Sequence, residues 1–463
     1  MSEAVMSVGE PHASSPARNS HSPDDAHAAG HGVAFTVDNL VVGRRIRFPI
    51  FDQGGILLLA AGSVINPRFK ELLASRGLRE VFLNPADVLG MAAADSRQTG
   101  SPAAITFDFA TFQPLEELID SRRLFMEDTG PKFKDRILQQ GCTGFNPEQQ
   151  DLLVRKHTEA CWRLDRMIKA VSRGNPPDIE EIATIVSDHL VYLVADSDCV
   201  IDILARRNDY AGVAQHCLQM SLLGMIMAIE AGMSENDIRL VGLCGLVHDW
   251  GITYVPEHIR NADHVLTQIE FLEIQKHPIY TLDLLHQIKG IHPQAPIVCY
   301  QVHERPNGTG YPRGRWGSSI HRCARILHVA DAYTALLSPR PFRRALDPYA
   351  VLEYLIRQAA ERMVDAEAVR TLLYVVSQFP IGSSVQLSDG RQARVVRRNG
   401  NNYSSPIVQI VQNADGTPAD ASDTSQIIDP SQHQLTITKV LPTEGHFDIE
   451  ASRESVVLNR ERE

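Results

Sequence analysis

The sequence contains no apolar run that approaches the length of a membrane-spanning helix. The stretch GILLLAAG at 55–62 is short and ends in glycine, whereas a spanning helix needs roughly 20 apolar residues. The N-terminus also lacks the basic, apolar and small-residue segments of a secretory signal in that order. These absences predict a cytoplasmic protein without membrane insertion.

Close pairs of cysteine are missing as well. The seven cysteines are scattered, at positions 142, 161, 199, 217, 244, 299 and 323. Disulfide frameworks and zinc knuckles need closely spaced cysteines, so this scatter favours buried, reduced thiols.

Positive charge is in deficit over the whole chain. The formal net charge is -11 at pH 7. Proteins that coat nucleic acids present a basic face, so we expect no polymeric nucleic acid as a partner. A single local patch of basic residues remains compatible with a small anionic ligand.

The residues that are present suffice for several folded units. At 463 residues with 43% apolar content, the chain exceeds what one core organises, and about two to four units are expected. Turn signals separate short β-like runs near both ends, and apolar residues at helical spacing dominate the middle. We predict a mainly α protein, with a disordered tail at 1–33, a small α+β domain at 34–84, a linker at 85–104, a helical region at 105–204, an all-helical central domain at 205–375, a small β domain at 376–441 and a charged tail at 442–463.

Five segments of the central region each bring histidine or aspartate to an otherwise apolar surface. Burial of these side chains without a partner would cost several kcal/mol, so a bound metal is the simplest explanation. The candidate ligands are His216, His248, Asp249, His277, His303 and Asp331.

The adjacency of His248 and Asp249 narrows the chemistry further. Neighbours on a helix point about 100° apart, so they serve one metal together only at a helix end, or when the carboxylate bridges two ions. A bridging aspartate is typical of two-metal hydrolysis of phosphoesters.

The order H…HD…H…HE, followed by NGTGYP and then by D and SPRPFRRA, resembles the HD-GYP family, a branch of the HD phosphohydrolases. The resemblance covers about residues 205–375. It implies an all-helical domain that holds divalent metals, usually iron or manganese, and opens cyclic di-GMP to pGpG or GMP. It also implies one metal at His216, His248, Asp249 and Asp331, and a second at Asp249, His277 and His303, with Asp249 and His303 as the catalytic candidates.

The residues after His303 are interpreted as the substrate side of the site. The resemblance implies that Glu304 orients a ligand histidine, that Gly308 and Gly310 allow close backbone approach, and that Tyr311 and Pro312 stiffen the loop against a guanine. Arginine suits phosphate oxygens and stacks on guanine. From His303 to Arg344 the arginines, without any lysine, are Arg305, Arg313, Arg315, Arg322, Arg325, Arg340, Arg343 and Arg344, and of these Arg305, Arg340 and Arg343 are the predicted substrate contacts.

The sequence departs from the family pattern at three positions. Ile252 replaces a lysine that reaches the phosphate, Val302 replaces a ligand histidine, and Gly212 replaces the glutamate of three-metal members. Loss of a cation at the transition state costs about 2–4 kcal/mol, so we expect reduced activity with one or two metals. Two alternatives stay open: a receptor that binds cyclic di-GMP, a signalling protein or a second copy of the chain without hydrolysis, and a single-metal phosphohydrolase of another nucleotide.

Overall fold

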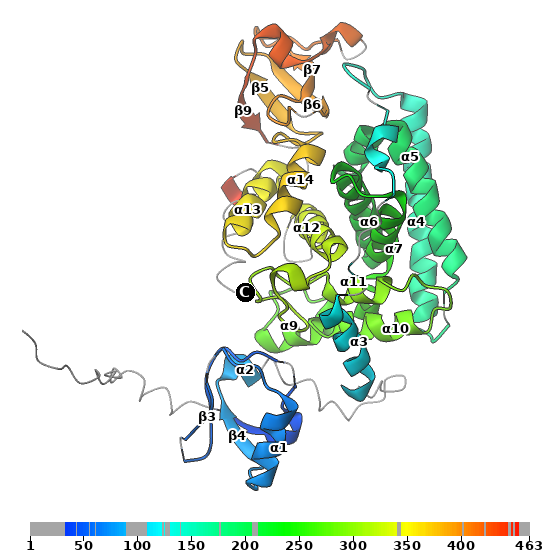
Figure 1. Ribbon diagram of the computed structural model, residues 1–463. Coiled ribbons are helices and arrows are strands. Elements are labelled where there is room, and N and C mark those ends of the chain that lie inside the picture. Colours follow the sequence, from blue (N-terminus) through cyan, green and yellow to red (C-terminus); the bar gives the residue numbers. More distant parts are fainter. Residues whose placement is uncertain are drawn as a thin grey trace, which may run out of the picture. The chain divides into compact units, whose positions relative to one another are not determined.

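The structure is a computed structural model of the full chain (Figure 1). It describes residues 33–88, 109–122, 125 and 130–452, except for short gaps at 43, 55, 61, 139, 176, 206–211, 340–343, 401, 421–422, 443–445 and 448–449. Residues 1–32 of the tail predicted at 1–33, most of the predicted linker and residues 453–463 lie outside the described residues. The chain divides into two compact units, before and after Ser96.

The smaller unit is a four-stranded antiparallel sheet packed against short helices. The strand order is β1-β4-β2-β3. The side chains of Ile46, Ile65 and Val81 lie in the core of this unit. Asn66 accepts a hydrogen bond from the Phe69 backbone and so caps the first helix. The elements are β1 (Val33–Thr36), β2 (Ile50–Phe51), β3 (Leu57–Leu59), α1 (Pro67–Ser75), β4 (Glu80–Leu83) and α2 (Pro85–Val88).

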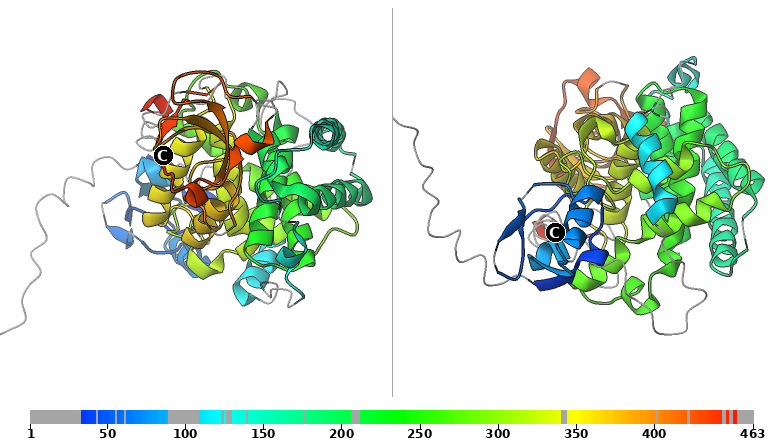
Figure 2. Two further views of the ribbon diagram at one scale, coloured as in Figure 1. Left: turned by 90° about the horizontal axis from the view of Figure 1, so that it is seen from above. Right: turned by 60° about the horizontal axis from the view of Figure 1, so that its bottom comes forward.

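The larger unit is built from helices around a central one. The central helix α6 is buried on all sides over most of its length, as expected for a helix that is apolar all round. Figures 1 and 2 show α4 and α5 side by side along one flank, with α6 and α7 inside them and α12 beyond. The helices are α3 (Phe109–Ser121), α4 (Pro147–Val171), α5 (Ile179–Ala205), α6 (Val213–Glu230), α7 (Glu235–Val247), α8 (Glu257–Arg260), α9 (Gln268–Ile274), α10 (His277–His286), α11 (Ala295–Gln301), α12 (Arg322–Leu337), α13 (Pro348–Ala360) and α14 (Ala366–Val376).

Glycine allows α6 and α7 to approach each other closely. A Cβ atom on Gly245 would lie 2.5 Å from the Cα atom of Ser221, which no real contact tolerates. In addition, the Ser221 hydroxyl donates a hydrogen bond to the carbonyl of Gly242. This close contact fixes the end of α7 against α6, and both helices carry candidate metal ligands.

The C-terminal sheet shares the core of the helices. Its apolar residues, such as Val385 and Val395, belong to the same buried cluster as α6 and α14. The guanidinium of Arg397, which is buried, pairs with Asp196 on α5 at 2.9 Å. The strands, in the order β8-β7-β6-β5-β9, are β5 (Ser384–Leu387), β6 (Gln392–Arg397), β7 (Ile407–Gln412), β8 (Ile427–Ile428) and β9 (Ile437–Leu441).

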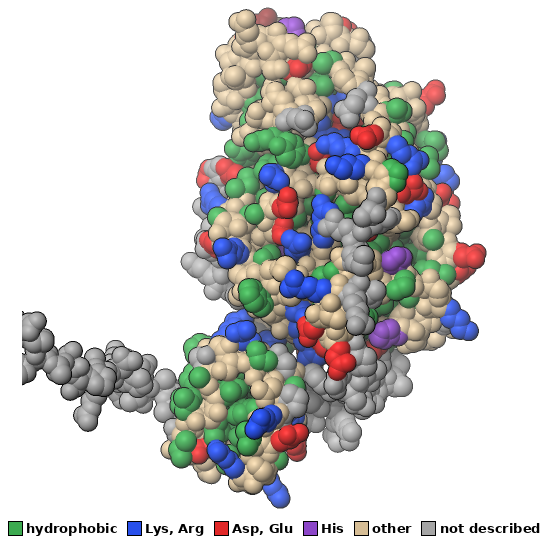
Figure 3. Space-filling view, in the orientation of Figure 1, with side chains coloured by type: hydrophobic (Ala, Val, Ile, Leu, Met, Phe, Trp, Pro, Cys, Tyr) green, Lys and Arg blue, Asp and Glu red, His purple; other side chains and the backbone are tan. Residues whose placement is uncertain are grey.

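The predicted fold class is confirmed, with a mainly helical body between a small α+β unit and a small sheet. The predicted domain limits stay predictions, although Ser452 of the predicted charged tail is buried and accepts a hydrogen bond from the Asp347 backbone. On the face shown in Figure 3, basic and acidic side chains are interspersed over the helical unit. None of the helices in the described part of the chain is both long and apolar enough to cross a bilayer.

Candidate metal centre

The six predicted metal ligands lie on five elements that meet beside α6. His216 lies in the first turn of α6, and Asp331 lies within α12. His248 and Asp249 stand at the end of α7, where the chain leaves the helix for the short 3-10 helix η5 (Trp250–Tyr254). His277 begins α10, and His303 follows α11 by two residues.

The first group comprises His216, His248 and Asp249. One potential ligand atom from each lies within 4.8 Å of the others. The His248 Nε2 atom is 3.6 Å from a carboxylate oxygen of Asp249. Asp331 adjoins this group, because its carboxylate lies 2.9 Å from His216 Nε2.

The second group comprises Asp249, His277 and His303, so Asp249 belongs to both groups. The His277 Nε2 atom lies 3.0 Å from Asp249 Oδ1 and 2.8 Å from His303 Nε2. The Nδ1 atom of His303 also lies 3.6 Å from the Oδ2 atom of Asp331. We call the six residues the candidate centre. The structure brings all of them together, and their role as metal ligands stays a prediction.

His248 and His277 present unprotonated nitrogen atoms to the candidate centre. The Nδ1 atom of His248 lies 3.0 Å from the carbonyl of Gly245, and that of His277 lies 2.7 Å from the carbonyl of Ile274. Since a carbonyl only accepts, each Nδ1 carries the proton and each Nε2 keeps its lone pair. The Nε2 atom of His248 is buried without a hydrogen-bond partner among the described residues. Such an atom, beside two carboxylates, fits a bound divalent metal.

The electrostatics of the candidate centre favour the protonation states that bind metals. Burial by itself would raise the pKa of Asp249, but the neighbouring His248 and His277 outweigh it and hold that pKa well below its ordinary value. Burial would also raise the pKa of Asp331, and here the hydrogen bond and charge of His216 lower it instead. Burial, followed by the charge of His277, lowers the pKa of His303. Ionised carboxylates and neutral imidazoles are the metal-binding forms of these groups.

Gly251 allows the chain after Asp249 to pass close to α10. A Cβ atom there would lie 2.2 Å from the carbonyl oxygen of His277. The Gly251 backbone donates a hydrogen bond to the hydroxyl of Thr281, which in turn donates to the carbonyl of His248. The spacing between Asp249 and His277 is thereby fixed through the backbone.

The loop at 305–316 is organised by Glu304, which is only 1% exposed. Its two carboxylate oxygens accept hydrogen bonds from the backbones of Arg313 and Arg315, each at 2.7 Å. Gly310 has no room for a side chain, because a Cβ atom would lie 2.3 Å from the Arg305 backbone nitrogen. Through these contacts Glu304 fixes the loop that carries Tyr311.

Tyr311 lies flat against His303. The two rings are 4.9 Å apart and inclined by 12°, which is a stacked arrangement. The ring of Phe271 is almost perpendicular to that of Tyr311, with 6.3 Å between the ring centroids. Tyr311 therefore orients a predicted ligand directly, in addition to the expected stiffening of the loop.

A pocket of about 1040 Å³ opens beside the candidate centre. Asp249, His277, His303 and Asp331 form part of its wall, together with Tyr311. The remaining wall comes from several helices and from the chain around the C-terminal sheet, and it includes Leu204, Ile252, Arg260, Phe271, Arg344 and Ile381.

The predicted substrate-binding residues differ in whether they line the pocket. Of those that are described, Tyr311 lines the pocket, whereas Arg305, Gly308, Gly310 and Pro312 are not among its lining residues. The two glycines act within the loop instead, and Gly308 adopts a φ of 80°, which favours glycine. Arg340 and Arg343 lie outside the described residues.

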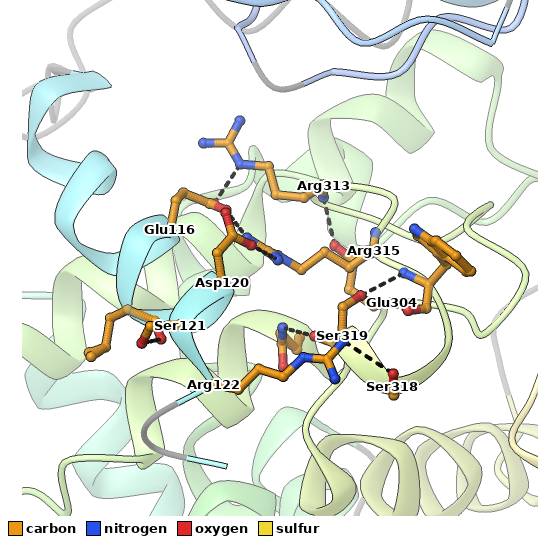
Figure 4. Close-up of polar contacts among 12 residues, drawn as sticks. Glu116, Asp120, Ser121, Arg122, Glu304, Arg313, Arg315, Ser318 and Ser319 are labelled. Atoms are coloured by element: carbon orange, nitrogen blue, oxygen red, sulfur yellow. Dashed lines mark hydrogen bonds and ion pairs between the residues drawn. The ribbon is translucent and has the colours of Figure 1, made fainter.

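Three of the arginines between His303 and Arg344 pair with acids: Arg325 with Asp365, and Arg313 and Arg315 with residues of α3. The guanidinium groups of Arg313 and Arg315 pair with acids of α3, as Figure 4 shows. Arg313 lies 2.8 Å from Glu116, while Arg315 contacts Glu116 and lies 2.6 Å from Asp120. These acids come from almost 200 positions earlier in the sequence.

Sequence reasoning also missed Arg260 and Phe271. Both residues line the pocket, from α8 and α9, but neither belongs to a recognisable motif. A charge count over the segment that follows His248 and Asp249 would have found Arg260.

The two residues that replace family residues are both buried. Ile252 packs in an apolar cluster with Val255 and Ile259, and Val302 is fully buried.

Comparisons with known proteins agree on the central domain. Residues 198–368 match the model of a family described as HD domain. The cyclic di-GMP phosphodiesterase PA4108 of Pseudomonas aeruginosa is 27% identical over 252 residues, which are 54% of this chain and 58% of that protein. The cyclic di-GMP phosphodiesterase response regulator RpfG of Xanthomonas campestris is 33% identical over 173 residues, or 37% of this chain and 46% of that protein.

Other relatives carry a different substrate in their names. The 3'3'-cGAMP-specific phosphodiesterase 1 of Vibrio cholerae is 29% identical over 168 residues, or 36% of this chain and 38% of that protein. The chain thus spans between 38% and 58% of the length of these three relatives. A solved structure of the protein Bd1817 from Bdellovibrio bacteriovorus matches with a TM-score of 0.42 and 15% identity, over 73% of this chain and 97% of that one.

Proposed function

We propose that this chain, whose residues 198–368 match the HD-domain family and whose motifs resemble the HD-GYP branch, is a metal-dependent phosphodiesterase that opens cyclic di-GMP to pGpG or GMP. The observation that carries the proposal is the convergence of six histidine and aspartate side chains, from five elements, beside one large pocket. The names of two relatives supply the substrate.

We assign one divalent ion to His216, His248, Asp249 and Asp331, and a second one to Asp249, His277 and His303. Iron or manganese suits this mixture of imidazole and carboxylate donors. When bound, such ions would polarise a phosphoryl oxygen and lower the pKa of a nucleophilic water. Asp249 and His303 remain the catalytic candidates, because they lie where both groups meet the pocket.

The surrounding residues keep these donors in place. Carbonyl groups of α7 and of the last residue of α9 hold the Nδ1 protons of His248 and His277. Tyr311 stacks on His303, and Glu304 holds the loop that carries Tyr311. Donors that are already oriented cost little reorganisation when substrate binds.

The pocket suits a nucleotide with aromatic bases. Phe271 is exposed and lines the pocket beside Tyr311, so it offers an edge or face to a guanine. Stacking of a base on an aromatic side chain contributes about 1–3 kcal/mol. A second candidate substrate is 3'3'-cGAMP, which is named for one relative and shares a guanine with cyclic di-GMP.

Turnover is expected to be slow. Ile252 offers no cation to the phosphate, and Val302 removes one donor from the second group. The loss of one cation alone corresponds to a rate about 30- to 1000-fold lower. These two residues favour the receptor, which would bind the nucleotide and signal to a partner protein or a second copy, as the alternative to the enzyme.

The proposal is tested by loading the purified chain with Mn(II) or Fe(II) and following cyclic di-GMP, pGpG and GMP by chromatography. A parallel calorimetric titration measures binding, and 3'3'-cGAMP is assayed in the same way. We expect slow formation of pGpG that requires metal and that disappears in Asp249→Asn.

Each result selects one function. Binding of cyclic di-GMP without product over many hours selects the receptor, and gain of hydrolysis in Ile252→Lys with Val302→His then identifies the missing groups. Neither binding nor turnover of either dinucleotide contradicts the proposal. Hydrolysis of another nucleotide by the metal-loaded chain would then select the single-metal phosphohydrolase. His258→Asn, a change of an exposed histidine outside the candidate centre, is the matched control.

A further inference from the structure

Two arginines line the described part of the pocket beside the candidate centre. Among the described residues that line it, the arginines are Arg260 and Arg344, and no lysine is present. Arg344 has an aromatic neighbour, because its guanidinium lies 5.8 Å from the centre of the Phe447 ring. Arg260 and Arg344 are therefore the two arginines of the described wall that an anion in this pocket could meet.

Arg260 differs from the other arginines near the site. It is half-buried at the end of α8, and its side chain makes no hydrogen bond or ion pair with any residue that the structure describes. By contrast, Arg313 and Arg315 pair with Glu116, and Arg325 pairs with Asp365. A guanidinium is always charged, and a partly desolvated one gains from an anionic partner. The pocket is where such a partner would bind.

The place of Arg260 in the fold connects it with the missing lysine. Ile252 from η5 and Ile259 from α8 pack in one small apolar cluster, and Arg260 follows Ile259 directly. Ile252 and Arg260 both line the pocket. The two positions therefore lie on neighbouring parts of the same wall, which also carries Asp249 of the candidate centre.

We propose that Arg260 is a substrate-binding residue that supplies the phosphate of a cyclic dinucleotide with the cation that Ile252 cannot supply. The inference rests on the proposed function and deepens it. Arginine can donate two parallel hydrogen bonds to phosphate oxygens, whereas a lysine donates as a point charge. In this arrangement Arg260 on α8 takes over phosphate binding from the lysine that Ile252 replaces. The positive charge then acts at a different place on the wall of the pocket.

The test compares variants in a calorimetric titration of the Mn(II)-loaded full chain with cyclic di-GMP. Arg260→Gln removes the charge, and Arg260→Lys keeps it. The control is Arg357→Gln, because Arg357 also lies in the last turn of its helix, is exposed, and does not line the pocket. Thermal unfolding of each variant shows whether the fold is retained.

We expect Arg260→Gln to weaken binding by about 10- to 100-fold, the usual effect of a lost charge-assisted hydrogen bond. Arg260→Lys should lose less than about tenfold, and Arg357→Gln should bind like the wild type. In the background of Arg260→Gln, Ile252→Lys should restore part of the affinity. Where turnover is measurable, KM should rise more than kcat falls.

Two results overturn the inference in distinguishable ways. If the wild type binds and Arg260→Gln binds equally well, Arg260 does not contact the phosphate and the proposed function stands. If the wild type itself binds neither cyclic di-GMP nor 3'3'-cGAMP, the proposed function fails and the inference fails with it. If Arg260→Gln unfolds, Arg260→Lys provides the test. An affinity of Arg260→Lys for cyclic di-GMP equal to that of the wild type supports the role of the charge. A loss of affinity as large as 100-fold in this variant contradicts it.

Discussion

Glu116 accepts a hydrogen bond from the guanidinium Nε atom of Arg313 at 2.8 Å, across 197 positions of the sequence. The same carboxylate contacts Arg315, and it accepts a hydrogen bond from the hydroxyl of Tyr300. Helix α3 is thereby tied to the 305–316 loop (Figure 4). Tyr311 of this loop stacks on His303. The order of the candidate centre thus depends on a helix far from it in the sequence.

Glu116→Gln should destabilise this loop. The substitution removes the charge that Arg313 and Arg315 share and leaves two largely buried guanidinium groups without it. We expect the free energy of unfolding to fall by about 1–3 kcal/mol, as for other hydrogen bonds to charged groups. Urea denaturation measures the change, and the exposed neighbour Glu117 gives the control variant Glu117→Gln. Equal stability of the two variants would show that the ion pairs contribute nothing.

Tyr311→Ala should weaken metal binding without unfolding the chain. The ring holds His303 by stacking, and the loss of such a supporting partner costs about 10- to 100-fold in metal affinity. Titration of the chain with Mn(II) measures the effect. Tyr311→Phe keeps the ring and should bind metal like the wild type. A similar loss in both variants would assign the effect to the hydroxyl rather than to stacking.

His157 should make stability depend on acid pH. Burial, together with the charge of His189, lowers the pKa of His157 to about 4 from an ordinary value of 6.5. Between these two values the unfolded chain binds a proton that the folded chain excludes, so the free energy of unfolding falls as the pH falls from 6.5 to 4. The full effect is roughly 3 kcal/mol. Above pH 6.5 this group has no influence.

The check is a series of denaturation curves of the wild type and His157→Leu over that range. The variant should lose less stability between pH 7 and pH 4 than the wild type does, whereas carboxylates affect both chains alike. Parallel curves for the two chains would mean that His157 takes up its proton in the folded state. Its Nε2 atom, which is buried without a partner among the described residues, argues for the steeper wild-type curve.

Much of the fold and of the candidate centre could be predicted because the signals are local. Asn66, Asn146 and Asp365 each precede an apolar periodic segment and cap a helix in the structure. The six candidate ligands could be selected because each interrupts an apolar helical surface, and the structure brings them together. Helix α7 ends at Val247, so His248 and Asp249 stand at a helix end, which is one of the two arrangements that their adjacency allows.

The roles of the arginines could not be predicted in this way. Arg313 and Arg315 look available in the sequence, since few acids stand near them, but α3 brings Glu116 and Asp120 to them. Arg260 carries no motif and acquires its position from the packing of Ile259 against Ile252. Charge pairing acts through space, so a count along the chain cannot assign partners to charges.

The sequence by itself determined which segments are helices, where several of them begin, and which histidines and aspartates could serve a metal, because periodicity, capping and ligand chemistry are properties of neighbouring residues. Only the tertiary structure decided which cations are paired, that Tyr311 stacks on His303, and that Arg260 faces the pocket. The physical reason is that these contacts join segments far apart in the chain, and their geometry follows from the packing of the whole helical unit.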